Sequence, residues 1–164
     1  MGAVEDEREA ARAVAIHYLE YSARSRSQLE RRLERDGFSP ETVLYVVEDC
    51  QSRRYIDDEA FAGRWVEDRG ERKLYGKRRL QSELRGRGVD KESVETALES
   101  VSEDDELRRA QEALEKRWKP GFTRARDSAE ASRERTRMMG YLARRGFGAR
   151  TIGQVLKQAL ENSA

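Results

Sequence analysis

Basic side chains recur at helical spacing between residues 69 and 87, and the chemistry open to them is anion binding. This stretch holds eight Lys or Arg residues and two Glu residues. Arg78 and Arg85 are seven positions apart, so they share one face of a helix, with small Ser82 between them. Such a face favours contact with a phosphate chain or an acidic protein surface; the alternative is an ordinary solvated helix face. The bases around it are Lys73, Lys77 and Arg87.

A second basic face is predicted between residues 124 and 150, which hold eight Arg residues and three acidic ones. Arg137 and Arg144 are again seven positions apart, with Gly140 between them. The neighbouring bases are Arg133, Arg145 and Arg150. Between the two basic stretches, residues 90–115 contain ten acids and three bases, which makes them a candidate protein-binding surface.

Aromatic residues add one open question to the first basic stretch. Tyr75 lies between Lys73 and Lys77, where its ring has two uses: stacking on a nucleic-acid base or packing against its own helix. Trp65 and Trp118 lie on apolar stripes, so we expect both in the core.

No residue is expected to catalyse a reaction or bind a metal ion, and no cofactor is expected. His17 is the sole histidine and lies in the middle of a predicted helix. Cys50 is the sole cysteine, at a position where a small buried hydrophobe is expected. Asp57, Asp58 and Glu59 suit the start of a helix better than a Mg²⁺ site. We therefore expect a protein that is not an enzyme.

The elements that would position these side chains form an internal repeat of helix, glycine and helix. Its three copies are Leu29, Leu33, Gly37, Val43 and Val47; Leu80, Leu84, Gly88, Val94 and Leu98; and Met138, Leu142, Gly146, Ile152 and Leu156. One such match would be weak, but three in register predict tandem helical units that share apolar surface.

We predict an all-α fold of about nine helices without a sheet, elongated and curved. The three-helix repeats cover residues 8–52, 53–101 and 102–162, with residues 1–7 frayed. A flexible loop is expected near residues 120–132, after Pro120-Gly121, with the next helix at 133–145. Ser25 and Gln28 form a predicted capping box, and the repeated glycines are predicted helix ends.

Composition limits the remaining possibilities. Hydrophobic residues make up 37% and charged residues 40%, which suits small local cores better than one large one. The net charge of +1 gives no global sign of nucleic-acid binding. A single cysteine is typical of a reducing compartment, and no signal peptide or membrane span is evident. We expect a cytoplasmic monomer with no membrane partner.

Several ordered motifs resemble the RecX family, bacterial regulators of the RecA recombinase. They are S-R-S before Leu29 and Leu33, the run D-D-E-A-F-A from Asp57, G-x-x-R-L-x-x-E-L-x-x-x-G-V from Gly76, and a late R-R-G-F from Arg144. The resemblance covers about residues 10 to 160. The sequence departs from the family pattern at Ser22-Ala23, before Arg24, and in the 123–132 loop. Neither departure affects the repeated positions.

The resemblance implies a function that spacing alone does not. RecX-like proteins bind the groove of the RecA filament on DNA and limit filament growth, ATP hydrolysis, strand exchange and co-protease activity. They also bind single-stranded and double-stranded DNA. The residues expected to face DNA or the filament are Lys73, Lys77, Arg78, Arg85, Arg87, Arg137, Arg144 and Arg145.

Two alternatives remain open at this point. A helix-turn-helix protein would bind DNA without RecA, but its would-be recognition helices are rich in acids that the DNA major groove repels. These acids are Glu41, Glu48, Asp49, Glu92, Glu95 and Glu99. A structural adaptor without DNA affinity would keep its activity when Arg78 and Arg85 are both changed to Glu.

Overall fold

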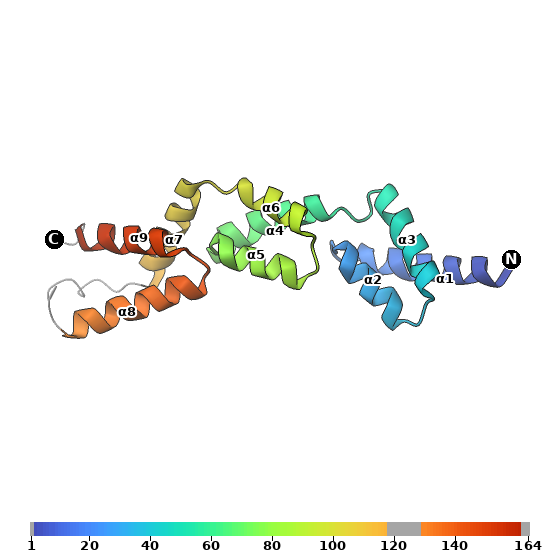
Figure 1. The fold of residues 1–164 in the computed structure, drawn as a ribbon, viewed down its shortest axis with the longest axis horizontal. Coiled ribbons are helices and arrows are strands. Elements are labelled where there is room, and N and C mark those ends of the chain that lie inside the picture. The colour runs from blue at the N-terminus through green and yellow to red at the C-terminus, as the bar shows by residue number, and fades with distance from the viewer. Residues whose placement is uncertain (1, 118–128, 162–164) are drawn as a thin grey trace. The chain divides into compact units, whose positions relative to one another are not determined.

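Helices make up the regular structure of the chain in the computed structural model, which describes residues 2–117 and 129–161 (Figure 1). Within these ranges there are nine helices and no strand, so the predicted all-α class is confirmed. The helices are α1 (Gly2–Glu20), α2 (Arg26–Arg35), α3 (Pro40–Ser52), α4 (Asp58–Lys73), α5 (Lys77–Gly86), α6 (Lys91–Glu99), α7 (Glu103–Arg117), α8 (Ala129–Arg144) and α9 (Ala149–Glu161).

The chain divides into two compact units, and the divisions fall inside α4, α5 and α6. The first unit comprises the chain up to Arg64 together with Leu84–Thr96. The second comprises Trp65–Glu83 together with the chain from Ala97 onwards. The boundaries of the three predicted repeats stay a prediction.

The first unit has a core between α1, α2 and α3. Its fully buried residues come from one face of each helix: Ala11, Ala15, Leu29, Leu33, Val46 and Val47. Cys50 joins this core as predicted, and burial raises the pKa of its thiol. The starts of α2 and α3 are capped as predicted. Ser25 and Gln28 form the capping box of α2, and Ser39 caps α3 before Pro40.

The predicted fraying of residues 1–7 is wrong, because α1 already begins at Gly2. Glu7 accepts hydrogen bonds from the Ser39 amide and hydroxyl, both at 2.8 Å, and from the Thr42 hydroxyl at 2.6 Å. The Thr42 bond and then the Ser39 bonds lower the pKa of the Glu7 carboxyl. These contacts join the start of α1 to the start of α3, and they are invisible to local sequence reasoning.

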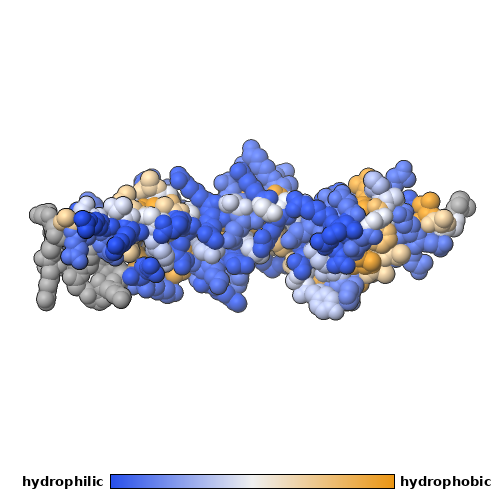
Figure 2. Space-filling model, turned by 90° about the horizontal axis from the view of Figure 1, so that it is seen from below, coloured by the Kyte–Doolittle hydropathy of each residue, from blue (hydrophilic) through white to orange (hydrophobic). Residues whose placement is uncertain are grey.

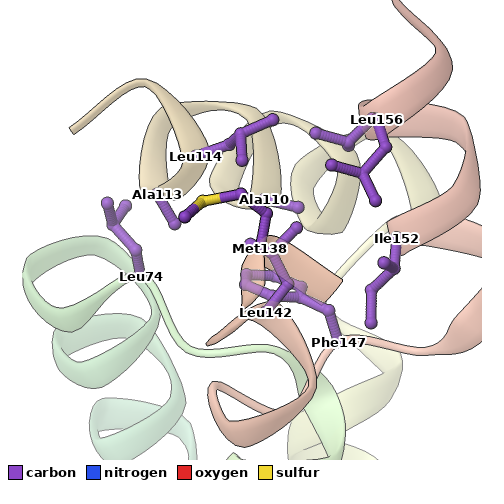
Figure 3. Packing of buried hydrophobic residues seen from close by; sticks show 10 residues of the cluster. Leu74, Ala110, Ala113, Leu114, Met138, Leu142, Phe147, Ile152 and Leu156 are labelled. Carbon is purple, nitrogen blue, oxygen red and sulfur yellow. The ribbon is translucent and has the colours of Figure 1, made fainter. Parts of the chain in front are cut away.

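The second unit has its own core between α7, α8, α9 and the turn after α4. Figure 3 shows these apolar side chains gathered between the helices. They are Leu74, Ala110, Ala113, Leu114, Met138, Leu142, Phe147, Ile152, Val155 and Leu156. As Figure 2 shows, hydrophilic residues cover much of the visible exterior, in keeping with the high charged fraction.

The loop predicted near residues 120–132 is partly corrected. Helix α8 begins at Ala129, four residues before the predicted start at Arg133. Ala131 is 5% exposed and lies seven positions before Met138, so it extends the inner stripe of α8 by two turns. Residues 118–128, including Trp118, lie outside the described part of the chain.

A buried arginine connects α4 and α7 in the second unit. The Glu71 carboxylate accepts hydrogen bonds from Arg109 at 2.9 and 3.1 Å and from Arg108 at 2.8 Å. The Arg109 side chain is 7% exposed. A Cβ at Gly70 would overlap its guanidinium group, so the small residue makes room for it. Glu71 therefore compensates a charge that has little access to water.

This arrangement predicts a pH-dependent stability. The hydrogen bond from Arg108, and then that from Arg109, lower the pKa of Glu71 in the folded chain. A lowered folded-state pKa contributes stability that is fully present above the unfolded value of about 4.3 and is lost as pH falls through the folded value. Glu71→Gln should therefore reduce the free energy of unfolding near neutral pH, and the difference from the native chain should shrink below about pH 4.

Urea unfolding measured across the acid range tests this expectation. Glu67→Gln is the matched control, since it removes the same charge from α4, and Glu67 is exposed without an ion pair among the described residues. A Glu71→Gln difference that stays constant down to about pH 3 would contradict the assigned role of the carboxylate.

Candidate nucleic-acid interface

The first turn of α5 packs directly on the turn between α8 and α9. The amide of Gly76 donates to the Arg145 carbonyl at 2.8 Å, and that of Arg78 donates to the Gly146 carbonyl at 3.2 Å. The amide of Lys77 donates to Glu106 Oε1 at 3.1 Å. The free N–H groups that every helix start exposes are therefore satisfied by protein atoms here. We call this contact the α5 junction.

Two glycines allow the backbones to approach this closely. A Cβ at Gly76 would lie 2.5 Å from the Gly146 carbonyl oxygen. Gly146 itself has φ of +90°, and a Cβ there would overlap the backbone nitrogen of Arg79. The sequence predicted Gly146 as a helix end. Its second role is to let α5 pack closely against it, and this role depends on a contact between distant parts of the chain.

The same junction recurs in the first unit, where α2 takes the place of α5. The Ser25 hydroxyl donates to the Arg87 carbonyl at 2.6 Å. A Cβ at Gly88 would overlap the side chain of Ser27. Gly37, the equivalent glycine of the first repeat, has φ of +89°, but a Cβ there would meet no atom within 4 Å. The repeated glycine is thus a docking point in two of its three copies.

The α5 junction concentrates positive charge in the second unit. Lys73, Arg78 and Arg144 are exposed, and Lys77 is half-buried. Among the described residues, no carboxylate forms an ion pair with these four side chains. We define the basic junction cluster as Lys73, Lys77, Arg78, Arg79, Arg144 and Arg145. The junction thus gathers bases that are up to 72 positions apart in the chain.

Two members of the cluster also hold the junction together. Arg79 pairs with Glu83 at 3.3 Å, as the i,i+4 spacing predicted, and its Nη1 donates to the Arg144 carbonyl at 3.2 Å. Nη1 of Arg145 donates to the carbonyls of Lys73 and Leu74. Arg145 is therefore a positioning residue as well as a source of charge.

The other predicted residues do not join this cluster. Arg137 on α8 is exposed and pairs with Glu134 at 3.3 Å, which offsets its charge. Arg85 and Arg87 belong to the first unit, where Arg85 is exposed and Arg87 is half-buried. The backbone carbonyl of Arg87 serves the first-unit junction.

The aromatic residues of this region agree with expectation only in part. Tyr75 packs on Arg79 of the adjoining α5, with the guanidinium carbon 4.4 Å from the ring centroid, as the alternative of packing on its own helix predicted. Trp65 is only half-buried, so its assignment to the core is wrong. Its Nε1 donates to Glu83 at 3.1 Å, and Arg69 stacks on its ring at 4.5 Å. Tyr141 and Arg117 also contribute to this surface, and no sequence signal singled them out.

The acids around Asp57 serve the fold. The Asp57 carboxylate accepts the Ala60 amide at 2.9 Å, which confirms its predicted role as a helix cap. Asp58 accepts the Arg26 amide at 2.7 Å, and burial raises the pKa of its carboxyl. Both line a cavity of about 700 Å³ in the first unit, together with Asp90. Within the described ranges, no His, Cys, Asp or Glu cluster has the arrangement of a metal site, and no helix is long and apolar enough to span a membrane.

Comparisons with known proteins cover nearly the whole chain. Residues 11–50 match the first three-helix domain of RecX, and residues 57–98 match its second three-helix domain. "Regulatory protein RecX" of Corynebacterium efficiens is 32% identical over 157 residues, which covers 96% of this chain and 75% of the relative. The namesake from Deinococcus radiodurans is 32% identical, covering 96% of this chain and 72% of the relative.

A solved structure agrees at the level of the fold. The crystal structure of RecX from Lactobacillus salivarius superposes with a TM-score of 0.83 at 19% identity, covering 96% of this chain and 98% of that one. With two matched domains and relatives above 30% identity along most of their length, the chain belongs to the RecX family of regulatory proteins.

Proposed function

We propose that this protein regulates the RecA recombinase in the cytoplasm. It binds the RecA filament on DNA as a monomer and limits filament extension, which lowers ATP hydrolysis, strand exchange and co-protease activity. Family membership along almost the whole chain is the observation that carries this proposal.

The basic junction cluster supplies the DNA contact in this proposal. Lys73, Arg78 and Arg144 present charge that no described carboxylate neutralises. Phosphates of single-stranded or double-stranded DNA are ligands that such a surface attracts, because their contact releases condensed counterions. Lys77 adds a fourth charge beside them, and Arg85, Arg87 and Arg137 stay proposed contacts outside the cluster.

A RecA ATPase assay on single-stranded DNA tests the regulator. Added well below the molar amount of RecA, the protein is expected to reduce steady-state hydrolysis and to shorten filaments seen by electron microscopy. Unchanged hydrolysis and unchanged filament length would overturn the proposal.

A DNA-binding experiment distinguishes the RecA regulator from the helix-turn-helix alternative. Helices α3 and α6 would be the recognition helices, and both carry acids in their first turns, Glu41 and Glu92. We therefore expect no preference for one duplex sequence in competition binding at moderate salt. A strong preference for one duplex, together with no effect on RecA, would favour that alternative.

A further inference from the structure

Three arginines and two tyrosines of the second unit stack in an alternating row. In order, they are Arg79, Tyr75, Arg145, Tyr141 and Arg117. The guanidinium carbon of Arg79 lies 4.4 Å from the centroid of the Tyr75 ring. That of Arg145 lies 5.8 Å from Tyr75 and 5.0 Å from Tyr141, and that of Arg117 lies 5.6 Å from Tyr141. We call this row the arginine–tyrosine ladder.

Four separate segments build the ladder. Tyr75 belongs to the turn after α4, Arg79 to the first turns of α5, Arg117 to the end of α7, and Tyr141 to the last turns of α8. Arg145 follows α8 directly and holds the centre, since its Nη1 donates to the carbonyls of Lys73 and Leu74. The α5 junction therefore fixes where the ladder lies.

The charge of the ladder is poorly compensated. Among the described residues, Glu83 is its one acidic partner, and it pairs with Arg79 at 3.3 Å. Arg145 and Arg117 have no carboxylate partner in the described ranges. The Nε of Arg145 is buried without a hydrogen-bond acceptor. A half-buried guanidinium group without a carboxylate gains most from an anion that comes from outside the chain.

The geometry points to a phosphate rather than a nucleobase. Each tyrosine ring already has two guanidinium groups within 6 Å of its centroid, which leaves less room for a stacked nucleobase. A stacked guanidinium group keeps the N–H donors in its plane available, and these donors match two oxygens of a phosphate. In the described structure, Nη2 of Arg79 and Nη2 of Arg145 have no acceptor.

We propose that the arginine–tyrosine ladder binds the phosphodiester backbone of nucleic acid, with Tyr75 and Tyr141 as positioning residues that hold the guanidinium groups in place. The inference rests on the DNA contact in the proposed function and assigns its chemistry. Binding through the ladder depends on salt and not on base sequence. It adds the exposed Arg117 to the bases of the junction cluster and gives the half-buried Arg145 a direct role in binding.

The test measures binding of the full chain to a fluorescein-labelled oligothymidine between about 50 and 200 mM salt. Arg117→Gln should lower the slope of log K against log salt by about 0.7, the value for one lost phosphate on a single strand. Tyr141→Leu should weaken binding by about three- to tenfold and also reduce the slope, because two guanidinium groups lose their support. Tyr141→Phe keeps the ring and should restore both values.

Tyr45→Leu is the matched control in the first unit. Tyr45 also carries arginines on its ring, Arg8 at 4.1 Å and Arg12 at 5.9 Å, but lies outside the ladder. We expect its variant to bind like the native chain. Slopes that are unchanged in both Arg117→Gln and Tyr141→Leu would overturn the proposal. If Tyr141→Leu lowers the melting temperature, Arg117→Gln alone decides, since Arg117 is exposed.

The ATPase assay keeps this outcome separate from that of the proposed function. If the native protein inhibits RecA but does not bind the oligothymidine, the ladder proposal is wrong and the proposed regulation of RecA still holds. Native protein that binds with the ladder's salt dependence but does not affect RecA would support the ladder and overturn the regulator.

Discussion

Gly146→Ala is expected to destabilise the second unit by about 3 kcal/mol, from two separate effects. A residue with a Cβ at φ of +90° costs about 1–2 kcal/mol. The added Cβ also overlaps the backbone of Arg79, and such overpacking costs about 1–3 kcal/mol because α5 must move away. For a chain of 164 residues this corresponds to a melting temperature lower by roughly 6–12 °C.

Gly37→Ala separates the two effects. Gly37 has nearly the same backbone conformation, with φ of +89°, but its Cβ would meet no atom within 4 Å. We expect a loss of about 1–2 kcal/mol, from the backbone alone. Thermal unfolding followed by circular dichroism measures both variants, and hydrogen exchange shows which amides lose protection. Equal losses in the two variants would contradict the packing of α5 on Gly146.

The sequence was informative wherever the cause of a feature is local. Ser25 with Gln28, and Ser39 with Pro40, are caps that act over three or four residues, and all were predicted correctly. The glycine that ends α2, α5 and α8 was found because its backbone conformation is a local property. The all-helical class was also predicted correctly, because the apolar residues recur at helical spacing.

Features caused by distant residues were missed. The first turns of α1 are held by Ser39, which is 32 positions from Glu7. The start of α8 depends on burial of Ala131, a residue with little hydrophobic signal of its own. Trp65 lies on an apolar stripe, but it is only half-buried. Its Nε1 donates to Glu83, and Arg69 stacks on its ring. Tertiary contacts outweighed local pattern in each case.

The same distinction between local and distant causes applies to the candidate site. Spacing identified Arg78 and Arg144 as exposed bases, since a helix face is readable from sequence. It did not show that both meet at one junction, because that depends on Gly76 docking on Gly146. The structural use of Arg145, whose partner Lys73 is 72 positions away, has no signature in a single sequence.

Reversing the exposed charges of the junction should have the largest functional effect. In the triple variant Lys73→Glu, Arg78→Glu and Arg144→Glu, three proposed phosphate contacts become repulsive. At about 150 mM salt we expect affinity for single-stranded DNA to fall by roughly a hundredfold, because each lost contact removes its counterion release. Inhibition of the RecA ATPase should fall with it, if DNA contact contributes to filament binding.

A variant with the same change in net charge distinguishes local contact from overall electrostatics. Arg31→Glu, Arg35→Glu and Lys91→Glu alter three exposed bases of the first unit. This control should lose only the long-range attraction, which screening limits to about 8–10 Å near physiological salt. Its affinity should therefore stay within about tenfold of the native chain at about 150 mM salt. If both triple variants lose affinity equally, net charge governs binding and the junction has no special role. If only the junction variant loses it, the docking of α5 on the α8–α9 turn is what builds the DNA-binding surface, because it brings together bases from both chain segments of the second unit.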